Sequence, residues 1–225
     1  IVGEPTGLAV ATGHKGKTAL RARFSGREGH SALAPLAMNA LHLAAEFVQA
    51  LRAVQAEIAE RGARDGDYDV PYTTLHVGTL SGGSALNIVP NRAEAAFEIR
   101  ALAEDDPQTL LARLRAEAEA IVARADDADA GIEIETDFAY PGLATPTDAE
   151  VVSFVKRLTG ANATIKVAYG TEGGLFAERL GLPVVVCGPG SMAQGHKADE
   201  FVTEEQIARC DAMLDALIDR LEAAA

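Results

Sequence analysis

Apolar and polar side chains alternate in four stretches of the first 140 positions. In residues 17–24 apolar side chains alternate with arginines, and residues 92–100 follow the same pattern with both acids and arginines. A period of two is typical of a strand that buries one face. Residues 72–80 and 132–138 alternate in the same way. The pattern therefore predicts four half-buried strands.

Two helices are expected between these strands. Asn39 is placed to cap a helix whose apolar side chains recur every three or four positions as far as Val54. Asp106 precedes a proline, which is favoured at the first position of a helix, so a second helix begins there. The order strand, helix, strand, strand, helix, strand is that of a ferredoxin-like unit. Residues 15–140 are thus predicted to form an antiparallel sheet with two helices on one face.

The pattern changes after residue 140. Thr147 is expected to cap a helix, residues 165–169 a short strand, and the apolar run "PVVVC" a strand covered on both faces. Thr203 begins a last helix with a capping box. Its expected buried stripe is Ile207, Cys210, Leu214, Leu217, Ile218 and Leu221.

The predicted fold class is therefore α/β. Residues 1–14 and 141–225 are interpreted as the remnant of a parallel-sheet domain. The ferredoxin-like βαββαβ unit, residues 15–140, is inserted into it. The chain opens without methionine inside an apparent strand, so an upstream part is expected to be missing.

Composition narrows the class of protein. The 225 residues are 48% hydrophobic and carry a net charge of −13, from 33 acidic and 20 basic side chains. This excess argues against nucleic acid or an anionic membrane as partner, because both attract clustered Lys and Arg. No apolar run approaches the ~20 residues of a membrane span, and no signal peptide is visible. Cys187 and Cys210 are expected to be buried free thiols in a reducing cytoplasm.

The first candidate for a metal-binding or catalytic residue is His196, which lies in a Gly-rich loop after an apolar strand. Such loops carry the ligands of open α/β sheets, and Glu4 also follows a strand and can approach the same rim. One histidine is not a zinc site, which needs three or four protein ligands. His30 lies between a strand end and a helix start, where a histidine is a good donor. His14 is either a substrate contact or a hinge residue.

Six short runs occur in a fixed order along the chain. They are "IVGEPT", "HKG", "GREGHSALAP" with "NA" beyond it, "GGSALNIVPNRAEAAFEIR", "TEGGLF" and "GPGSMAQGHKADE". Together they resemble a family of co-catalytic metalloaminoacylases and carboxypeptidases, which includes acetylornithine deacetylases and succinyl-diaminopimelate desuccinylases. The resemblance covers essentially the whole chain, and "YGTEGGLF", "CGPGS" and "GHKADEF" are most similar to the acetylornithine deacetylases.

The resemblance implies a hydrolase with two zinc ions, for which cobalt can substitute, and a lid that forms homodimers. The implied substrate is a small N-acylated amino acid, in particular N-acetylornithine of arginine biosynthesis. By resemblance, Glu4 and His196 are metal ligands, and His30 steadies the oxyanion in a partner subunit's site. Four further residues are implied to contact substrate: Asn87, Arg100, Thr171 and Glu172. Of these, Arg100 is implied to bind a carboxylate and Glu172 to pair with an amine.

The sequence also departs from this family. The upstream H-x-D motif, the bridging Asp and the adjacent acids of "DEE-x-G" are not present. The chain is therefore interpreted as an incomplete portion of such an enzyme, inactive by itself. Two alternatives remain open: another hydrolase of the family, such as a desuccinylase, dipeptidase or carboxypeptidase, and a non-catalytic dimerisation or small-molecule-binding module.

Overall fold

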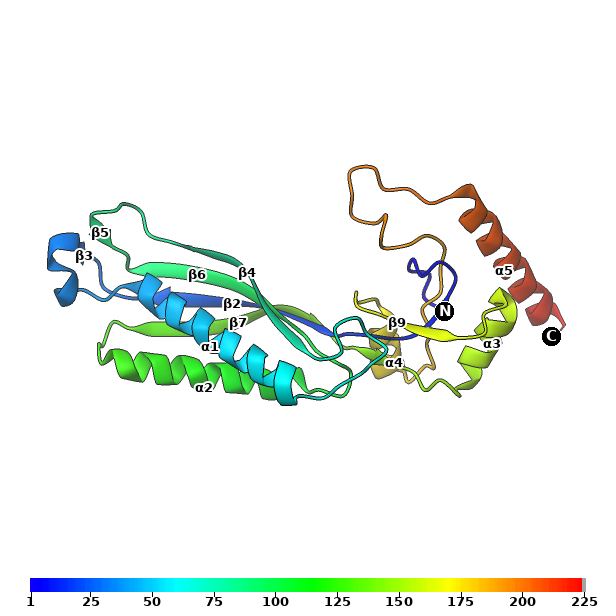
Figure 1. The fold of residues 1–225 in the computed structure, drawn as a ribbon, viewed down its shortest axis with the longest axis horizontal. Coiled ribbons are helices and arrows are strands. Elements are labelled where there is room, and N and C mark those ends of the chain that lie inside the picture. Colours follow the sequence, from blue (N-terminus) through cyan, green and yellow to red (C-terminus); the bar gives the residue numbers. More distant parts are fainter. Residues whose placement is uncertain (224–225) are drawn as a thin grey trace. The chain divides into compact units, whose positions relative to one another are not determined.

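The computed structural model describes residues 1–223, which form two compact units (Figure 1). Unit 1 comprises Ile1–Gly16, Asp65–Pro71 and the chain from Tyr140 onward. Unit 2 comprises Lys17–Arg64 and Tyr72–Ala139. The short segment Asp65–Pro71 is thus grouped with unit 1, a feature that the periodicity of the sequence does not reveal.

Unit 2 is built on a four-stranded sheet. Its strands are β2 (Lys17–Ser25), β4 (Thr74–Gly82), β6 (Arg92–Arg100) and β7 (Gly131–Tyr140), in the spatial order β4-β6-β2-β7. Strands β2 and β4 both pair antiparallel with β6. This strand order, with one helix after β2 and one after β6, is the ferredoxin-like arrangement, so the predicted insertion is confirmed.

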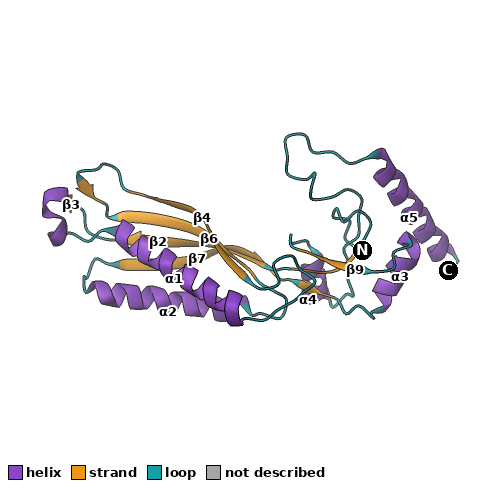
Figure 2. Ribbon diagram, viewed as in Figure 1, coloured by secondary structure: helices purple, strands orange, loops and turns teal. Residues whose placement is uncertain are grey.

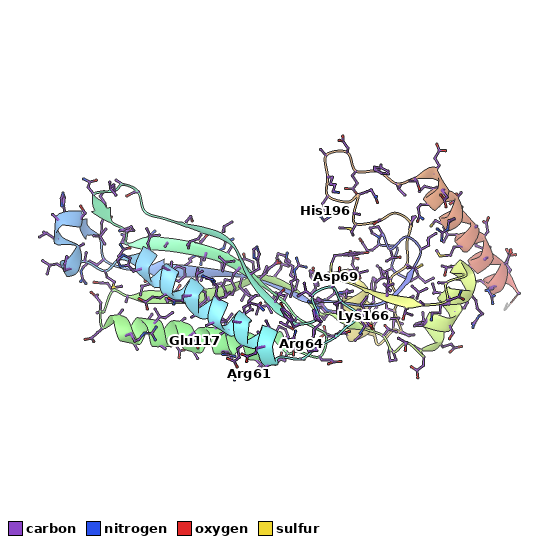
Figure 3. All side chains as sticks on the ribbon, viewed as in Figure 1. Arg61, Arg64, Asp69, Glu117, Lys166 and His196 are labelled. Carbon is purple, nitrogen blue, oxygen red and sulfur yellow. The ribbon has the colours of Figure 1, made fainter. Side chains whose placement is uncertain are left out.

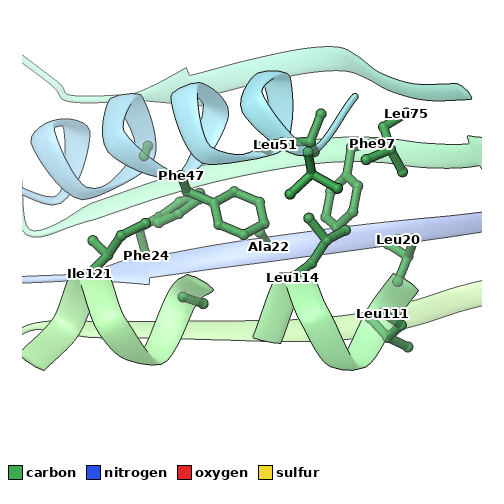
Figure 4. Packing of buried hydrophobic residues seen from close by; sticks show 14 of the residues in the cluster. Leu20, Ala22, Phe24, Phe47, Leu51, Leu75, Phe97, Leu111, Leu114 and Ile121 are labelled. Atoms are coloured by element: carbon green, nitrogen blue, oxygen red, sulfur yellow. The ribbon is translucent and has the colours of Figure 1, made fainter. Parts of the chain in front are cut away.

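Helices α1 (Ala40–Arg61) and α2 (Pro107–Ala125) pack on one face of this sheet (Figure 4). Both predicted caps form, because Asn39 accepts a hydrogen bond from the Leu41 amide and Asp106 accepts one from the Gln108 amide. At the centre of the core, the Phe47 ring lies 5.7 Å from that of Phe24 and 5.6 Å from that of Phe97. The opposite face of the sheet carries the charged side chains, as the alternation predicted.

A small ribbon extends unit 2 beyond the main sheet. Strand β3 (Gly29–His30) pairs antiparallel with β5 (Ile88–Val89), and the 3-10 helix η1 (Ser31–Leu36) follows β3. Every residue of η1 is exposed. This ribbon is called the tip below.

Unit 1 contains a second sheet with the order β8-β1-β9. Its strand β9 is labelled in Figure 2. Strand β1 (Val10–His14) runs parallel to β9 (Thr164–Val167) and antiparallel to β8 (Leu143–Ala144). Helices α3 (Glu150–Thr159) and α5 (Glu204–Glu222) pack together over one apolar cluster, and α4 (Gly173–Leu180) contacts β8. The α/β class predicted from the sequence is confirmed.

Two local predictions in unit 1 are wrong. In the run "PVVVC" residues 184–187 are buried and Pro183 is exposed, but the run is not a strand, because Val186 alone pairs, in parallel with Val2 and antiparallel with Ala11. The apolar content correctly predicted burial. A β-strand also needs a neighbouring strand that pairs with several successive residues, which this run lacks. Thr147 does not cap α3, since Ala149 occupies the N-cap position without a side-chain hydrogen bond.

Helix α5 begins as predicted but does not bury its predicted stripe. The Thr203 hydroxyl accepts a hydrogen bond from the Gln206 amide, yet Met213 is the buried residue of α5, and Cys210 is only partly buried. The exposed members of the stripe are Ile207, Leu214, Ile218 and Leu221. An apolar groove of about 650 Å³ lies beside α5, and both free cysteines line it. None of the helices within residues 1–223 is long and apolar enough to cross a membrane.

Candidate functional site

The loops that carry Glu4 and His196 are joined by main-chain hydrogen bonds. The Thr6 and Leu8 amides both donate to the Gly188 carbonyl, at 3.2 and 2.9 Å, and the Gly7 amide donates to the Gly190 carbonyl at 2.7 Å. The Gly188 amide in turn donates to the Thr6 hydroxyl. The structure thereby brings together two loops that the sequence separates by more than 180 positions.

Gly188 has no room for a side chain. A Cβ atom at this position would overlap the carbonyl oxygen of Gly3 and lie 2.7 Å from that of Glu4. The φ angle of Gly188 lies outside the left-handed region, so the requirement for glycine is steric. The missing side chain allows the main chain at Glu4 to lie directly against the start of the His196 loop.

His196 lies on the loop that leads into α5, with its side chain exposed (Figure 3). Its φ of 58° is in the left-handed region, which is uncommon for a residue other than glycine. The His196 amide donates to the Glu200 carboxylate at 2.8 Å, which holds the turn. A strained main chain at an exposed histidine is a feature seen at ligand-binding positions.

The described residues supply too few donors for a complete metal centre. A carboxylate and an imidazole are ordinary zinc ligands, so Glu4 and His196 fit in kind. Within residues 1–223, however, no three His, Cys, Asp or Glu side chains cluster so that they could hold a metal ion. Residues 1–223 therefore contribute at most a partial ligand set.

Tyr169 adds a contact that the sequence analysis missed. Its hydroxyl donates to the Pro5 carbonyl at 2.6 Å, and it comes from the loop between β9 and α4. Burial raises the pKa of Tyr169, and the negative charge of Glu4 raises it further. The signal available in the sequence was an aromatic residue two positions before Thr171. Tyr169 thus connects the Glu4 loop to the segment that carries Thr171 and Glu172.

The two candidate substrate contacts in that segment differ in exposure. Thr171 is buried, and its hydroxyl accepts a hydrogen bond from the Gly173 amide at 3.0 Å. Glu172 is exposed and occupies the N-cap position of α4 without a side-chain capping bond. Of the two, the Glu172 carboxylate is the one that a dissolved cation can reach.

His14 is fully buried and acts within the fold. Its Nδ1 lies 3.0 Å from the Lys15 carbonyl oxygen, and its Nε2 accepts a hydrogen bond from the Gly174 amide at 3.3 Å. A carbonyl only accepts, so the neutral ring with its proton on Nδ1 satisfies both partners. Burial lowers the pKa of His14, against the opposing influence of the Lys15 carbonyl and Glu172. This arrangement ties β1 to α4.

The tip of unit 2 brings His30 and Asn87 together. His30 pairs with Ile88 across the ribbon, and the Ser31 amide donates to the Asn87 carbonyl at 3.0 Å. The Ala32 amide donates to His30 Nδ1 at 3.1 Å. In the neutral ring the proton therefore lies on Nε2, which leaves an exposed donor at the tip.

Arg100 is engaged with a neighbouring carboxylate. Its Nε lies 2.9 Å from Oε1 of Glu98, and its Nη2 lies 3.4 Å from Oε2. Both residues point to the charged face of the sheet, because they are two positions apart on β6. Any external carboxylate that binds Arg100 must therefore compete with Glu98.

Comparison with known proteins identifies the family. The M20 peptidase dimerisation domain matches residues 12–126, just over half of the chain. The chain belongs to the M20 peptidase family. Its unit 2 lies largely within the matched range.

Relatives of this M20 chain are named acetylornithine deacetylases. The protein from Myxococcus xanthus is 33% identical over 215 residues, which are 95% of this chain and 55% of the relative. The one from Pasteurella multocida is 32% identical over 97% of the chain and 56% of its own length. The chain thus spans about half the length of the curated relatives it matches.

Solved M20-type structures share the fold. The aminopeptidase PepT from Bacillus cereus superposes with a TM-score of 0.75 at 18% identity, over 95% of this chain and 54% of that one. A tripeptidase from Staphylococcus aureus gives 0.70 at 19% identity, over 91% and 51%. At these identities the likeness concerns the fold alone.

The steric requirement at Gly188 predicts that alanine destabilises the fold at position 188 but not at position 3. Gly188→Ala should lower the free energy of unfolding by about 1–3 kcal/mol, since the main chain at Gly3 and Glu4 must move. Gly3→Ala, where nothing lies within 4 Å of the added Cβ, should change it by less than about 0.5 kcal/mol. Urea denaturation measures both. Equal effects of the two substitutions would contradict the close approach at Gly188.

The buried His14 predicts a loss of stability in mild acid. Its pKa is lowered in the folded state, so its contribution is complete above about pH 6.5 and falls as the pH drops below that value. The slope should approach, but not exceed, about 1.4 kcal/mol per pH unit for this one proton. His14→Gln should flatten the decline between pH 6.5 and 5, while His42→Gln, at an exposed position, should retain it. Unfolding curves at four pH values distinguish the two outcomes.

Proposed function

We propose that this M20 chain is part of a metal-dependent amide hydrolase that removes the acetyl group from N-acetylornithine, yielding ornithine and acetate. The names of the two relatives, both about a third identical to the chain, support this substrate. The structural observation that carries the proposal is the hydrogen-bonded junction between the Glu4 loop and the loop that leads to His196.

Glu4 and His196 are the proposed metal ligands. When bound there, zinc would supply Lewis-acid polarisation of the amide carbonyl and activation of a water molecule; cobalt is the proposed substitute. The general base and the remaining ligands are proposed to come from further polypeptide, since residues 1–223 hold no three-ligand cluster. The exposed apolar groove beside α5 fits a surface against which such polypeptide packs.

His30 is proposed to stabilise charge on the carbonyl oxygen of the substrate. The Ala32 amide holds the neutral ring in the tautomer that carries its proton on Nε2. A donor fixed in advance is the arrangement that stabilises developing negative charge most effectively. Asn87 lies beside His30 at the tip, where its side chain is proposed to assist in orienting the amide.

The charged ends of the substrate are assigned to two other residues. Arg100 is proposed to bind the carboxylate, because a guanidinium group presents paired donors to a planar anion. Glu172 is exposed and is proposed to pair with the amine of the ornithine side chain. Thr171 is buried beside it and is proposed to shape the pocket. The two free thiols fit the reducing cytoplasm that we propose as the location.

Activity assays of the full-length protein test this function. With zinc or cobalt it should hydrolyse N-acetylornithine, whereas the 225-residue chain should not turn over, because its ligand set is partial. His30→Ala should lower kcat by about 10²-fold, on the scale of a lost oxyanion donor. His42→Ala, on exposed surface of α1, is the matched control and should leave kcat unchanged.

A substrate panel separates the related activities. Faster turnover of N-succinyl-diaminopimelate or of a dipeptide would replace the deacetylase assignment with the corresponding member of the family. Stoichiometric metal analysis addresses the other alternative, because full-length protein without bound zinc and without hydrolysis would favour a dimerisation or small-molecule-binding module. An unchanged kcat in His30→Ala would remove His30 from the mechanism.

We further propose that a homodimer forms through the β4 edge of unit 2. Strands β4 and β7 are the two edges of the sheet. Strand β4 carries no Asp, Glu, Lys or Arg, whereas β7 carries Glu133, Glu135 and Asp137. Charged side chains on an edge strand hinder pairing with another strand, also where they form ion pairs, as Glu135 and Asp137 do with Arg23 and Arg21. The uncharged edge is therefore the one suited to pair with a second copy.

Substituting each edge with a charge tests this choice. Leu80 on β4 is 49% exposed and Phe138 on β7 is 51% exposed, so they form a matched pair. Leu80→Glu should weaken dimerisation at least about tenfold, because two like charges would face each other across a paired edge. Phe138→Glu should leave the dimer unchanged. Sedimentation velocity of the 225-residue chain measures both, and the reverse result would assign the interface to β7.

A further inference from the structure

Three charged side chains meet where β2 begins and β6 ends. Lys17 is the first residue of β2 and Arg100 the last of β6, and these strands are antiparallel neighbours. Glu98 lies between the two cations. Its Oε2 is 3.1 Å from Lys17 Nζ, and its Oε1 is 2.9 Å from Arg100 Nε. Two cations thus share this one carboxylate.

The Arg100–Glu98 contact is asymmetric. The Nε contact is a normal hydrogen bond, but the second arm of the guanidinium is 3.4 Å from Glu98. In an unstrained bidentate pair, both guanidinium nitrogens would lie about 2.8 Å from the carboxylate oxygens. Arg100 remains 27% exposed, so an anion from solution can reach it.

Lys17 gives Glu98 a second partner that does not depend on Arg100. Partial burial would raise the pKa of Glu98, but hydrogen bonds from Arg100 and Lys17 outweigh this effect and hold the pKa below its ordinary value. A partly buried carboxylate that loses its only cation is costly. With Lys17 in place, Glu98 keeps a cation when Arg100 turns to another anion.

Two neighbouring arginines on this face of the sheet have other partners. Arg21 pairs with Glu94 and Asp137, and Arg23 pairs with Glu135. In that group three carboxylates surround two guanidinium groups, whereas Lys17, Glu98 and Arg100 carry two positive charges and one negative.

We propose that Glu98 is a positioning residue that occupies Arg100 until a substrate carboxylate replaces it, and that Lys17 holds Glu98 during the exchange. This rests on the proposed role of Arg100 in binding the substrate. Glu98 then sets the affinity for carboxylate-bearing substrates without taking part in bond cleavage. Its removal should strengthen substrate binding, whereas a merely structural partner of Arg100 would weaken binding when removed.

Steady-state kinetics of the full-length protein with N-acetyl-L-ornithine test the exchange. Glu98→Gln should lower KM about two- to fivefold, the range of a partly exposed ion pair, with kcat unchanged. Lys17→Met should raise KM by a similar factor, because Glu98 then competes more strongly for Arg100. In the Glu98→Gln background, Lys17→Met should have no further effect. If the enzyme prefers another N-acyl amino acid, the same comparison uses that substrate.

Two controls separate exchange from general electrostatics. Glu135→Gln removes an acid from the same sheet face without touching Arg100, and it should leave KM unchanged. The C-terminal carboxamide of the substrate lacks the competing anion, so its KM should not respond to Glu98→Gln. Glu98→Ala should act in the same direction as Glu98→Gln, which covers the case in which the glutamine amide itself bonds to Arg100.

The outcomes also distinguish this inference from the proposed function. A higher KM in both Glu98 variants, or an equal decrease in Glu135→Gln, would overturn the exchange while leaving the role of Arg100 intact. Arg100→Met should raise KM for the acid and not for the carboxamide. An unchanged KM in Arg100→Met would instead reject Arg100 as the carboxylate ligand, and the exchange with it.

Discussion

The main-chain contact at Gly188 is the constraint on which the arrangement of unit 1 depends. The carbonyl groups of Gly3 and Glu4 occupy the space that any side chain at Gly188 would need. Amides from Thr6 to Leu8 then bond to the Gly188 and Gly190 carbonyls. Because the two loops are joined mainly through main-chain atoms, the position of Glu4 relative to the start of the His196 loop depends little on flexible side chains.

Unit 2 positions its chemistry by a different means. Its three-phenylalanine core and two capped helices make a rigid support. The tip displays His30 from a short ribbon on that support, with the ring orientation set by the Ala32 amide. The opposite face of the same sheet carries an ion-pair network in which the number of acids and cations changes along the strands. A single sheet thus separates apolar packing from charge, which leaves Arg100 and Glu98 available to solvent.

Sequence predictions that rested on local signals were correct, whereas those that depended on the packing partner of a segment were not. Alternation along residues 92–100 located β6 to the residue, and Asn39 and Asp106 capped the helices as expected. These signals are local, because caps and strand faces are set by nearby residues. The predictions of a strand at "PVVVC" and of a buried stripe on α5 were wrong. Apolar content indicates a preference for burial, but it does not tell which neighbouring segment buries the residues.

The sequence by itself determined the α/β class, the inserted ferredoxin-like unit and the residue types that could carry metal and amide chemistry. Only the tertiary structure decided that Glu4 and Gly188 meet, that Tyr169 connects a third loop to them, that His14 is buried as a neutral ring, and that Glu98 already occupies Arg100. The physical reason is that the contacts of Glu4, Tyr169 and His14 join segments far apart in the sequence, whose approach depends on packing. Local periodicity places Glu98 and Arg100 on one face of the sheet, but it carries no information about which segments pack together or which side-chain conformations form.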